Sequence, residues 1–266
     1  MKIRLDQLLV IKNLVESREK AKALIMSGNV IVNGVIIDKP GKLVDINSDV
    51  KIKEKLKYVS RGGLKLETAL NYFKLDVKNF VCLDIGSSTG GFVDCLLQRG
   101  AKIVYAVDVG KNQLHEKLKN DKRVIYYEEK DARELTENEI KEKVHLITID
   151  VSFISLKLIL PVLKTLLVPG SDVIALVKPQ FEAGKANVGK KGVVRDAKIH
   201  MNVLETIGNF SQEVGFTLKN ASFSPITGGE GNIEFLFHLV ATETNETIFT
   251  EEQLKQIVRD AHQQLT

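Results

Sequence analysis

The stretch "LDIGSSTGGF", residues 83–92, joins a short apolar run to a glycine-rich loop. Glycines at positions 86, 90 and 91 allow the backbone to turn sharply and to approach a ligand closely. The segment that follows, "GGFVDCLLQRG", has the length and composition of a helix that starts at the loop. A strand, a glycine loop and a helix in this order predict an α/β domain with a ligand site at the loop.

Further apolar runs of strand length follow along the chain. The candidates are "KIVYAVDVG", "RVIYYEE", "VHLITIDVS", "DVIALVKP", "TLKNASFSPI" and "NIEFLFHLVA". Helix-length segments such as "SLKLILPVLKTLL" separate the earlier ones. Apolar strands that alternate with helices predict a parallel sheet covered on both faces, with ligands at the carboxyl ends of the strands.

Length and composition predict a cytoplasmic protein with no membrane partner. The chain has 266 residues, of which 44% are hydrophobic and 27% charged, as in ordinary globular proteins with one large and one small domain. No apolar stretch approaches the roughly 20 residues of a membrane span, and the first residues do not resemble a signal peptide. We therefore expect Cys82 and Cys95 to be reduced core thiols.

Positive charge is concentrated at the front of the chain. Residues 1–65 carry a net charge of +7, whereas the remaining residues carry −3. Such an asymmetry favours a polyanionic partner for the front segment.

The front segment has the pattern of a small α+β module. Ser17 is a candidate N-cap and Gly28 a candidate helix stop, and Asn33–Gly34 is typical of a hairpin turn. The arginine, "LDQLLV" and "SREKAKALIMSGNVIVNG" together resemble the RNA-binding domain named after ribosomal protein S-four. The resemblance implies that a basic face binds RNA. Its candidate contacts are Arg4, Arg18, Lys20 and Lys22.

The glycine loop of the large domain favours a nucleoside ligand with a positive charge. The loop lacks the G-x-G-x-x-G pattern of dinucleotide sites. Asp84 places a carboxylate beside the glycines, which suits a cation such as the amino group of S-adenosylmethionine. Asp108 ends the second strand, where an acidic side chain can bind ribose hydroxyls. Asp131 follows the third strand, and similarity to S-adenosylmethionine-dependent methyltransferases implies that a residue at this position contacts the adenine.

The residues after the fourth strand bear on which atom would be methylated. Enzymes that methylate a base amine commonly carry an Asn/Asp-Pro-Pro-aromatic turn here, but this chain has Asp150 followed by Val-Ser-Phe. Methylation of cytosine carbon five needs a cysteine at a strand tip, and both cysteines lie in other segments. A hydroxyl target remains. A base-nitrogen methyltransferase and a non-catalytic RNA-binding factor are the alternatives.

Four charged residues in order along the chain complete the pattern. Lys65, Asp150, Lys178 and Glu234 resemble the tetrad of FtsJ-type ribose 2′-O-methyltransferases. The blocks "SRGGLKL", "DVSFISL", "LVKPQFEAG" and "GGEGNIEF" resemble the TlyA (hemolysin A) family of rRNA cytidine 2′-O-methyltransferases, from the first helix to about residue 242. The resemblance implies that these four residues are catalytic. We expect Lys178 to act as a base or as a cationic steering group, positioned by Asp150, with the other pair orienting the ribose.

The resemblance also implies the fold, the cofactor and the remaining site residues. The expected fold is α/β, a Rossmann-like seven-stranded S-adenosylmethionine-dependent methyltransferase domain behind the small RNA-binding domain. The expected cofactor is S-adenosyl-L-methionine, with no metal, and the expected partner is ribosomal RNA of one or both subunits. The further candidate cofactor contacts are Gly86, Ser87, Ser88, Thr89, Gly90, Gly91, Phe92, Val109, Ala132 and Asp150 itself. The further candidate RNA contacts are Arg61, Lys185, Lys190, Lys191 and Arg195.

We expect the chain to divide into four segments. Residues 1–58 form the RNA-binding domain, 59–63 a linker, 64–242 the methyltransferase domain and 243–266 a C-terminal helix with a capping box at Thr250 and Gln253. We expect a monomer. The sequence does not favour two other functions. A membrane-active hemolysin would need a spanning or pore-forming segment, which is not seen here, and a pseudouridine synthase would not need the glycine loop.

Overall fold

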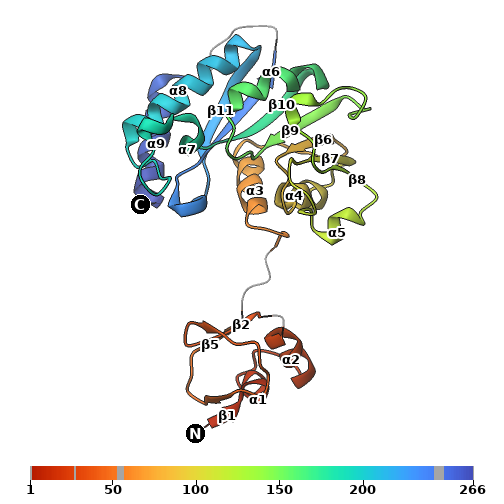
Figure 1. Ribbon diagram of the computed structural model, residues 1–266, viewed down its shortest axis with the longest axis vertical. Helices are drawn as coiled ribbons and strands as arrows, with labels where there is room; N and C mark the ends of the chain where they lie inside the picture. The colour runs from red at the N-terminus through yellow and green to blue at the C-terminus, as the bar shows by residue number, and fades with distance from the viewer. Residues whose placement is uncertain (1, 27, 53–56, 243–248, 266) are drawn as a thin grey trace. The chain divides into compact units, whose positions relative to one another are not determined.

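The computed structural model describes residues 2–26, 28–52, 57–242 and 249–265. The chain forms two compact units, Met1–Leu56 and Lys57–Thr266, which are described separately (Figure 1). Residues 53–56 of the expected RNA-binding domain and residues 243–248 of the expected C-terminal helix lie outside the described residues.

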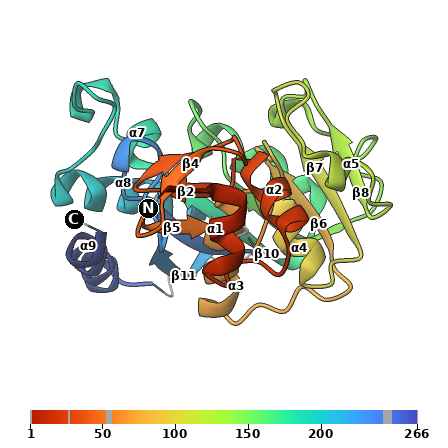
Figure 2. The ribbon, with the colours of Figure 1, turned by 90° about the horizontal axis from the view of Figure 1, so that it is seen from below.

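The first unit joins two helices to two small antiparallel sheets. Its elements are β1 (Lys2–Arg4), α1 (Leu5–Ile11), α2 (Arg18–Met26), β2 (Val30–Val32), β3 (Val35–Ile36), β4 (Leu43–Asp45) and β5 (Val50–Ile52). One sheet pairs β1 with β4, and the other has the order β3-β2-β5. Helices α1 and α2 lie side by side (Figure 2) and bury Leu8, Leu9 and Ile25 in a common core.

The local signals of the first unit are confirmed. The Ser17 hydroxyl accepts a hydrogen bond from the backbone N–H of Lys20 at 3.2 Å, as an N-cap does. Asn33 and Gly34 both have positive φ angles, 49° and 81°, which is the type I′ geometry that joins β2 to β3. The pairing of β1 with β4 was not expected, because three residues carry no periodicity of their own.

The second unit contains one seven-stranded sheet in the order β11-β12-β10-β9-β6-β7-β8. Its strands are β6 (Val81–Ile85), β7 (Ile103–Val107), β8 (Val124–Tyr127), β9 (Val144–Ile149), β10 (Leu167–Val177), β11 (Phe216–Phe223) and β12 (Phe235–Ala241). The strands from β8 to β10 are parallel, and β12 runs antiparallel to β10 and β11. The expected α/β fold with seven strands is confirmed.

Helices cover both faces of this sheet, as Figure 1 shows. The helices are α3 (Gly62–Tyr72), α4 (Gly91–Gln98), α5 (Glu116–Lys119), α6 (Leu160–Leu163), α7 (Pro179–Glu182), α8 (Ala197–Glu213) and α9 (Glu251–Leu265). Residues of α3, α4 and α5 share one apolar core with one face of the strands. Residues of α6, α8 and α9 share a second core with the other face. Successive residues of a strand therefore point into opposite apolar cores. For this reason the strands of the sheet that are covered on both faces need not alternate apolar with polar residues.

Three expected elements differ in detail from the structure. The helix expected over "SLKLILPVLKTLL" is broken into two 3-10 segments, Leu156–Leu158 and Lys164–Leu166, on either side of α6. Pro161 lies in the first turn of α6, where its missing N–H costs nothing. Proline cannot lie in the interior of a helix without breaking it, so one continuous helix cannot run from residue 156 through Pro161. Helix α3 begins at Gly62, inside the segment expected as a linker. Strand β12 begins at Phe235, three residues after the start of the strand expected over "NIEFLFHLVA".

The described part of the C-terminal segment is an amphipathic helix docked on its own unit. The backbone N–H of Gln253 donates to the hydroxyl of Thr250 at 3.3 Å, and the backbone N–H of Thr250 donates to Oε1 of Gln253 at 2.8 Å. These two hydrogen bonds form a capping box. Leu254, Val258 and Ala261 are buried in the core shared with α8. Both cysteines are free and buried, as expected.

Candidate active site

The site lies at the carboxyl ends of the central strands. β6 pairs with β7 on one side and with β9 on the other, so the chain order of the strands reverses at β6. Crevices in open α/β sheets form at such a reversal. Asp84 lies near the end of β6 and the glycines follow that strand, whereas Asp150 follows β9 and Lys178 follows β10. Three distant segments therefore meet at one edge of the sheet.

Glycine is required at the first turn of the loop after β6. Gly86 has a φ angle of 81°, and a Cβ atom there would lie 2.5 Å from the carbonyl oxygen of Asp150. The backbone N–H of Gly86 donates to the carbonyl of Val107 at 2.9 Å. The loop is therefore pressed against the start of the segment after β9, and this leaves its outer side open to a ligand.

Asp84 is a buried carboxyl group with one unsatisfied oxygen. It is 1% exposed, and its Oδ1 accepts a hydrogen bond from the hydroxyl of Thr148 at 2.6 Å. Its Oδ2 is buried and has no hydrogen-bond partner among the described residues. Burial raises the pKa of Asp84 to about 8, against the lowering effect of Thr148, and the charges of Asp150 and Asp108 raise it further. An unsatisfied buried acid of this kind is suited to a cationic group of a ligand.

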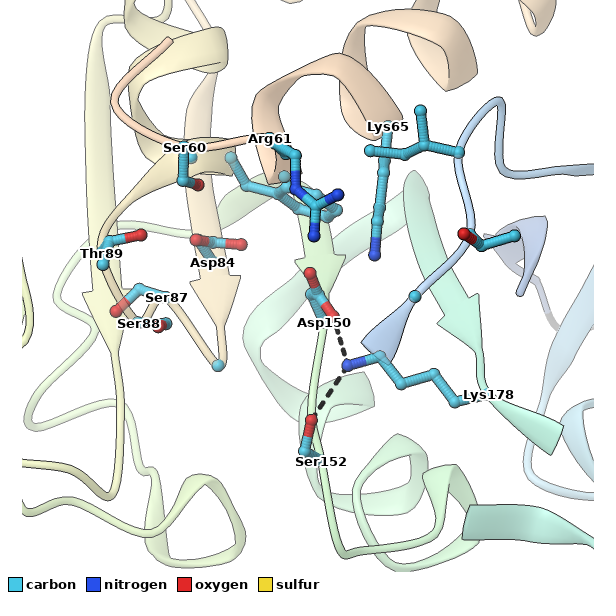
Figure 3. Close-up of a pocket in the computed structure, with 17 residues that line it drawn as sticks. Ser60, Arg61, Lys65, Asp84, Ser87, Ser88, Thr89, Asp150, Ser152 and Lys178 are labelled. Carbon is cyan, nitrogen blue, oxygen red and sulfur yellow. Dashed lines mark hydrogen bonds and ion pairs between the residues drawn. The ribbon is translucent and has the colours of Figure 1, made fainter. Parts of the chain in front are cut away.

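Two cavities meet at this edge of the sheet. A cavity of about 320 Å³ is lined by residues from five segments of the chain, and Asp84, Ser87 and Thr89 are among them (Figure 3). A neighbouring cavity of about 490 Å³ is lined by Asp108, Asp131 and other residues. The linings of both cavities include Gly86, Ser88, Asp150 and Ser152. A ligand as long as a nucleoside with an amino-acid tail can therefore extend through both.

Lys178 is held at the junction of the two cavities. Its Nζ lies 2.6 Å from Oδ1 of Asp150 and donates to the hydroxyl of Ser152 at 3.0 Å. Lys178 is only 8% exposed, and Figure 3 shows its side chain reaching the tip of β9 from the end of β10. A buried ammonium is tolerated where a carboxylate and a hydroxyl satisfy its N–H groups. This explains how a lysine can end an apolar strand.

A second buried pair lies on the other side of the smaller cavity. Nζ of Lys65, on α3, lies 2.5 Å from Oε2 of Glu234, which is 2% exposed. Lys65 lines the cavity, whereas Glu234 lies behind it against Gly228, where a Cβ atom would collide with the carboxylate. The structure thus brings the four expected catalytic residues together as two ion pairs, at the edge of one cavity.

The larger cavity contains the residues expected to bind a nucleoside, but two of its carboxylates already have partners. Asp108 accepts backbone N–H bonds from Ser88 and Gly110, both at 2.7 Å. Asp131 accepts from the backbone of Arg133 and forms an ion pair with its guanidinium at 2.5 Å, and these hydrogen bonds lower the pKa of Asp131. A nucleoside contact to either must use the remaining acceptor positions.

The other expected cofactor contacts divide between ligand-facing and structural positions. Ser87, Ser88, Thr89, Gly91 and Phe92 line the smaller cavity, and Val109 and Ala132 line the larger one. Gly90 lines neither cavity. It has a φ angle of 93° and faces the side chains of Leu114 and Leu118, so its role in the structure is to start α4 against that packing.

The expected RNA contacts fall in three places. Arg61 lines the smaller cavity, and Figure 3 shows its side chain reaching into the same space as that of Lys65. A depression between the loop after α7 and the start of α8 is lined by Lys190, Lys191 and Arg195 but not by Lys185. Arg4, Arg18, Lys20 and Lys22 belong to the first unit, where Lys20 pairs with Glu16 and Lys22 is exposed.

Several residues of the site were not identified from the sequence. Ser60 lines the smaller cavity, Thr148 holds Asp84, and Ser152 holds Lys178. The side chain of Asn232 accepts from the backbone of Val194 at 3.0 Å and donates to the carbonyl of Gly192 at 2.9 Å. Asn232 thereby connects the basic loop to the segment that carries Glu234. Ser60, Ser152 and Asn232 had a signal, since they lie within the blocks "SRGGLKL", "DVSFISL" and "GGEGNIEF".

Known proteins resemble this chain over both units. The FtsJ-like methyltransferase family matches residues 58–241, and the S4 domain matches residues 3–50. A Bacillus subtilis protein provisionally named rRNA methyltransferase YqxC is 55% identical, over 99% of this chain and 95% of its own length. The 16S/23S rRNA (cytidine-2′-O)-methyltransferase TlyA of Mycobacterium tuberculosis is 39% identical, over 92% of each chain.

A solved structure agrees with these matches. A protein from Streptococcus thermophilus, provisionally named a hemolysin, superimposes with a TM-score of 0.78 at 49% identity, over 99% of this chain and 96% of that one. The family match covers the sheet, the glycine loop and all four residues of the two buried ion pairs. This chain therefore belongs to the FtsJ-like methyltransferase family, in the group that joins an S4 domain to the methyltransferase domain.

Proposed function

We propose that this protein is an S-adenosylmethionine-dependent methyltransferase that methylates the ribose 2′-hydroxyl of cytidine in ribosomal RNA, of the 16S or 23S type or both. The Lys178–Asp150 pair at the junction of the two cavities is the main structural support. The names of the relatives support the ribosomal substrate and the cytidine target. Work on rRNA is consistent with a cytoplasmic location.

The residues present fit the proposed cofactor. The unsatisfied Oδ2 of Asp84 would accept from the α-amino group, and the close approach at Gly86 leaves room for the methionine part. Asp108, Val109, Asp131 and Ala132 line the cavity that would hold the adenosine part. When bound, S-adenosylmethionine supplies an electrophilic methyl group on a positively charged sulfur.

The two ion pairs would act on the ribose. Lys178 is the hydrogen-bond donor to both Asp150 and Ser152, and each contact uses an N–H of its Nζ. This favours the role of a cationic steering group, in which a remaining N–H binds the 2′-oxygen and stabilises negative charge as its proton is lost to water. Lys65, held by Glu234, would orient the sugar from the other side of the cavity. Alignment supplies most of the acceleration, because the leaving group is neutral.

Two units would then divide the work. Residues 1–58 would bind RNA through the S4 domain, residues 64–242 would carry out methyl transfer, and the helix in 243–266 would stabilise the second unit. Among the described residues, no helix has the length and apolar character needed to cross a membrane. The relatives' name hemolysin therefore gains no support from the described helices.

Methylation of rRNA by a Lys178→Ala variant tests the proposal. We expect methyl transfer to fall by about 10²–10³-fold, because removal of one donor that stabilises developing negative charge costs about that much. Binding of S-adenosylmethionine, measured by calorimetry, should be retained. Lys102→Ala is the control, since Lys102 forms an exposed ion pair with Glu142 at the opposite ends of the strands.

The position of the methyl group gives an independent test. Ribosomal subunits from cells that lack the gene are incubated with the protein and digested to nucleosides for mass spectrometry. We expect 2′-O-methylcytidine. A methyl group on the base, or full activity of Lys178→Ala, would contradict the proposed target and mechanism.

A further inference from the structure

The first unit contains a buried carboxylate that binds two arginines. Asp6, in the first turn of α1, is 0% exposed. Its two oxygens accept hydrogen bonds from Nε and Nη2 of Arg4, both at 3.0 Å. Its Oδ2 also accepts from Nη2 of Arg18 at 2.9 Å. Hydrogen bonds from Arg4 and then Arg18, opposed by burial, hold the pKa of Asp6 at about 2.

The two arginines come from different elements but are held close together. Arg4 ends β1 and Arg18 begins α2, and the helices α1 and α2 lie side by side (Figure 2). Both Nη2 atoms lie within 3.0 Å of the same oxygen of Asp6, so they are at most about 6 Å apart. Nη1 of Arg4 lies against Gly41, where an added Cβ would be 3.1 Å away. The position of the Arg4 guanidinium is therefore restricted on two sides.

The arginines themselves remain open to solvent. The side chain of Arg4 is 43% exposed and that of Arg18 is 46% exposed, although their common partner is completely buried. Each guanidinium keeps N–H groups that Asp6 does not use. The group of three residues has a net charge of one positive unit. Two fixed, half-exposed guanidiniums around one point match the oxygens of a phosphate group, which guanidinium binds with paired hydrogen bonds.

We propose that Asp6 is a positioning residue that holds Arg4 and Arg18 as a paired binding site for one phosphate group of RNA. This inference rests on the proposed function, in which residues 1–58 bind rRNA. The buried carboxylate restricts two long side chains before RNA arrives, so that less rotamer entropy is lost on binding. A negative charge within an RNA-binding surface thereby strengthens binding.

The test is the affinity of full-length Asp6→Asn for 23S rRNA transcribed in vitro, measured by filter binding at two salt concentrations. Simple charge counting predicts tighter binding, because a negative charge is removed. Positioning predicts binding that is weaker by about tenfold, because both guanidiniums lose their charged partner. Asp38→Asn is the matched control: Asp38 is an exposed carboxylate in the same unit, so its loss should leave binding equal or slightly tighter.

A double-mutant cycle separates positioning from loss of structure. In a variant with Arg4→Gln and Arg18→Gln, adding Asp6→Asn should produce no further loss of affinity. An equal loss in both backgrounds would mean that Asp6 acts on the fold alone. If Asp6→Asn does not fold, Arg4→Lys with Arg18→Lys replaces it, since charge is kept but paired hydrogen bonding is lost, and unchanged affinity would overturn the inference.

The failures of the two proposals are distinguishable. Absence of rRNA binding by the unsubstituted protein would overturn both. Binding by the unsubstituted protein, together with Asp6→Asn that binds as tightly as Asp38→Asn, would overturn the phosphate site alone.

Discussion

Replacing Asp84 with asparagine should stabilise the protein in the absence of ligand while weakening its binding of S-adenosylmethionine. The pKa of Asp84 is raised to about 8 by burial in the folded protein, from an ordinary value of 3.8. The folded state therefore binds more protons than the unfolded state between these values, so the free energy of unfolding falls as pH rises from about 4 to about 8. Asparagine keeps the shape but has no charge to bury.

The size of the effect follows from the pKa difference. Each pKa unit is worth about 1.4 kcal/mol, so the ionisable group costs about 4 kcal/mol of stability at pH 7 and about 2 kcal/mol at pH 5. In a unit of this length, about 4 kcal/mol corresponds to a rise in Tm of roughly 10 °C. These are upper values, since relaxation around the carboxylate reduces the cost of burying it.

The assay is thermal and urea unfolding of Asp84→Asn and the unsubstituted protein at pH 5, 6, 7 and 8 without ligand. The difference in stability should favour the variant and should increase with pH. Asp94→Asn is the control. Asp94 is equally buried but its oxygens accept from Val59, Gln98 and Lys117, so its replacement should lower stability at pH 7.

Ligand binding provides the second half of the test. When a cation binds at Oδ2, Asp84 should ionise, so calorimetry in buffers of different ionisation enthalpy should detect proton release at pH 7. Asp84→Asn should bind S-adenosylmethionine at least tenfold more weakly, since it loses a charge-assisted hydrogen bond. A variant that melts at or below the Tm of the unsubstituted protein, with a parallel pH profile, would refute the reasoning.

Two further predictions concern the smaller cavity. Gly86→Ala should lower the free energy of unfolding by at least about 2 kcal/mol and abolish methyl transfer, because the new Cβ would meet the carbonyl of Asp150 at 2.5 Å in a backbone region that alanine disfavours; normal melting and activity would exclude this close packing. Glu234→Gln should lower stability by about 3 kcal/mol, because it leaves the ammonium of Lys65 buried beside a neutral amide. The double variant with Lys65→Met should recover most of that stability but no methyl transfer, as measured by urea unfolding and incorporation of labelled methyl groups; an equally unstable double variant would mean that the pair is not coupled.

The order of elements and the region of the site could be predicted from the sequence for local reasons. A strand, a glycine turn and a helix leave their pattern in consecutive residues, because hydrophobic period and backbone freedom act over a few positions. This identified β6, the loop at Gly86, the hairpin turn at Asn33 and the capping box at Thr250. The resemblance then implied which charged residues belong to one site.

The partners of the charged side chains were decided by the tertiary structure. Arg4 and Arg18 appeared in the sequence as two separate cations, and only the fold places both on Asp6. Asn232 and Val194 lie 38 residues apart along the chain, and only the fold joins them through a hydrogen bond. Such pairings depend on which elements pack together, and a one-dimensional pattern holds no information on the distance between residues remote along the chain.

The chemical state of the site was likewise decided by packing. The sequence by itself showed Asp84 in an apolar run just before a glycine loop, and this pattern predicted a ligand site there. It did not determine that one oxygen would be satisfied by Thr148 and the other left without a partner, or that burial would raise the pKa. Desolvation depends on every neighbour in three dimensions, so only the folded structure reveals which carboxylate is prepared for a cation.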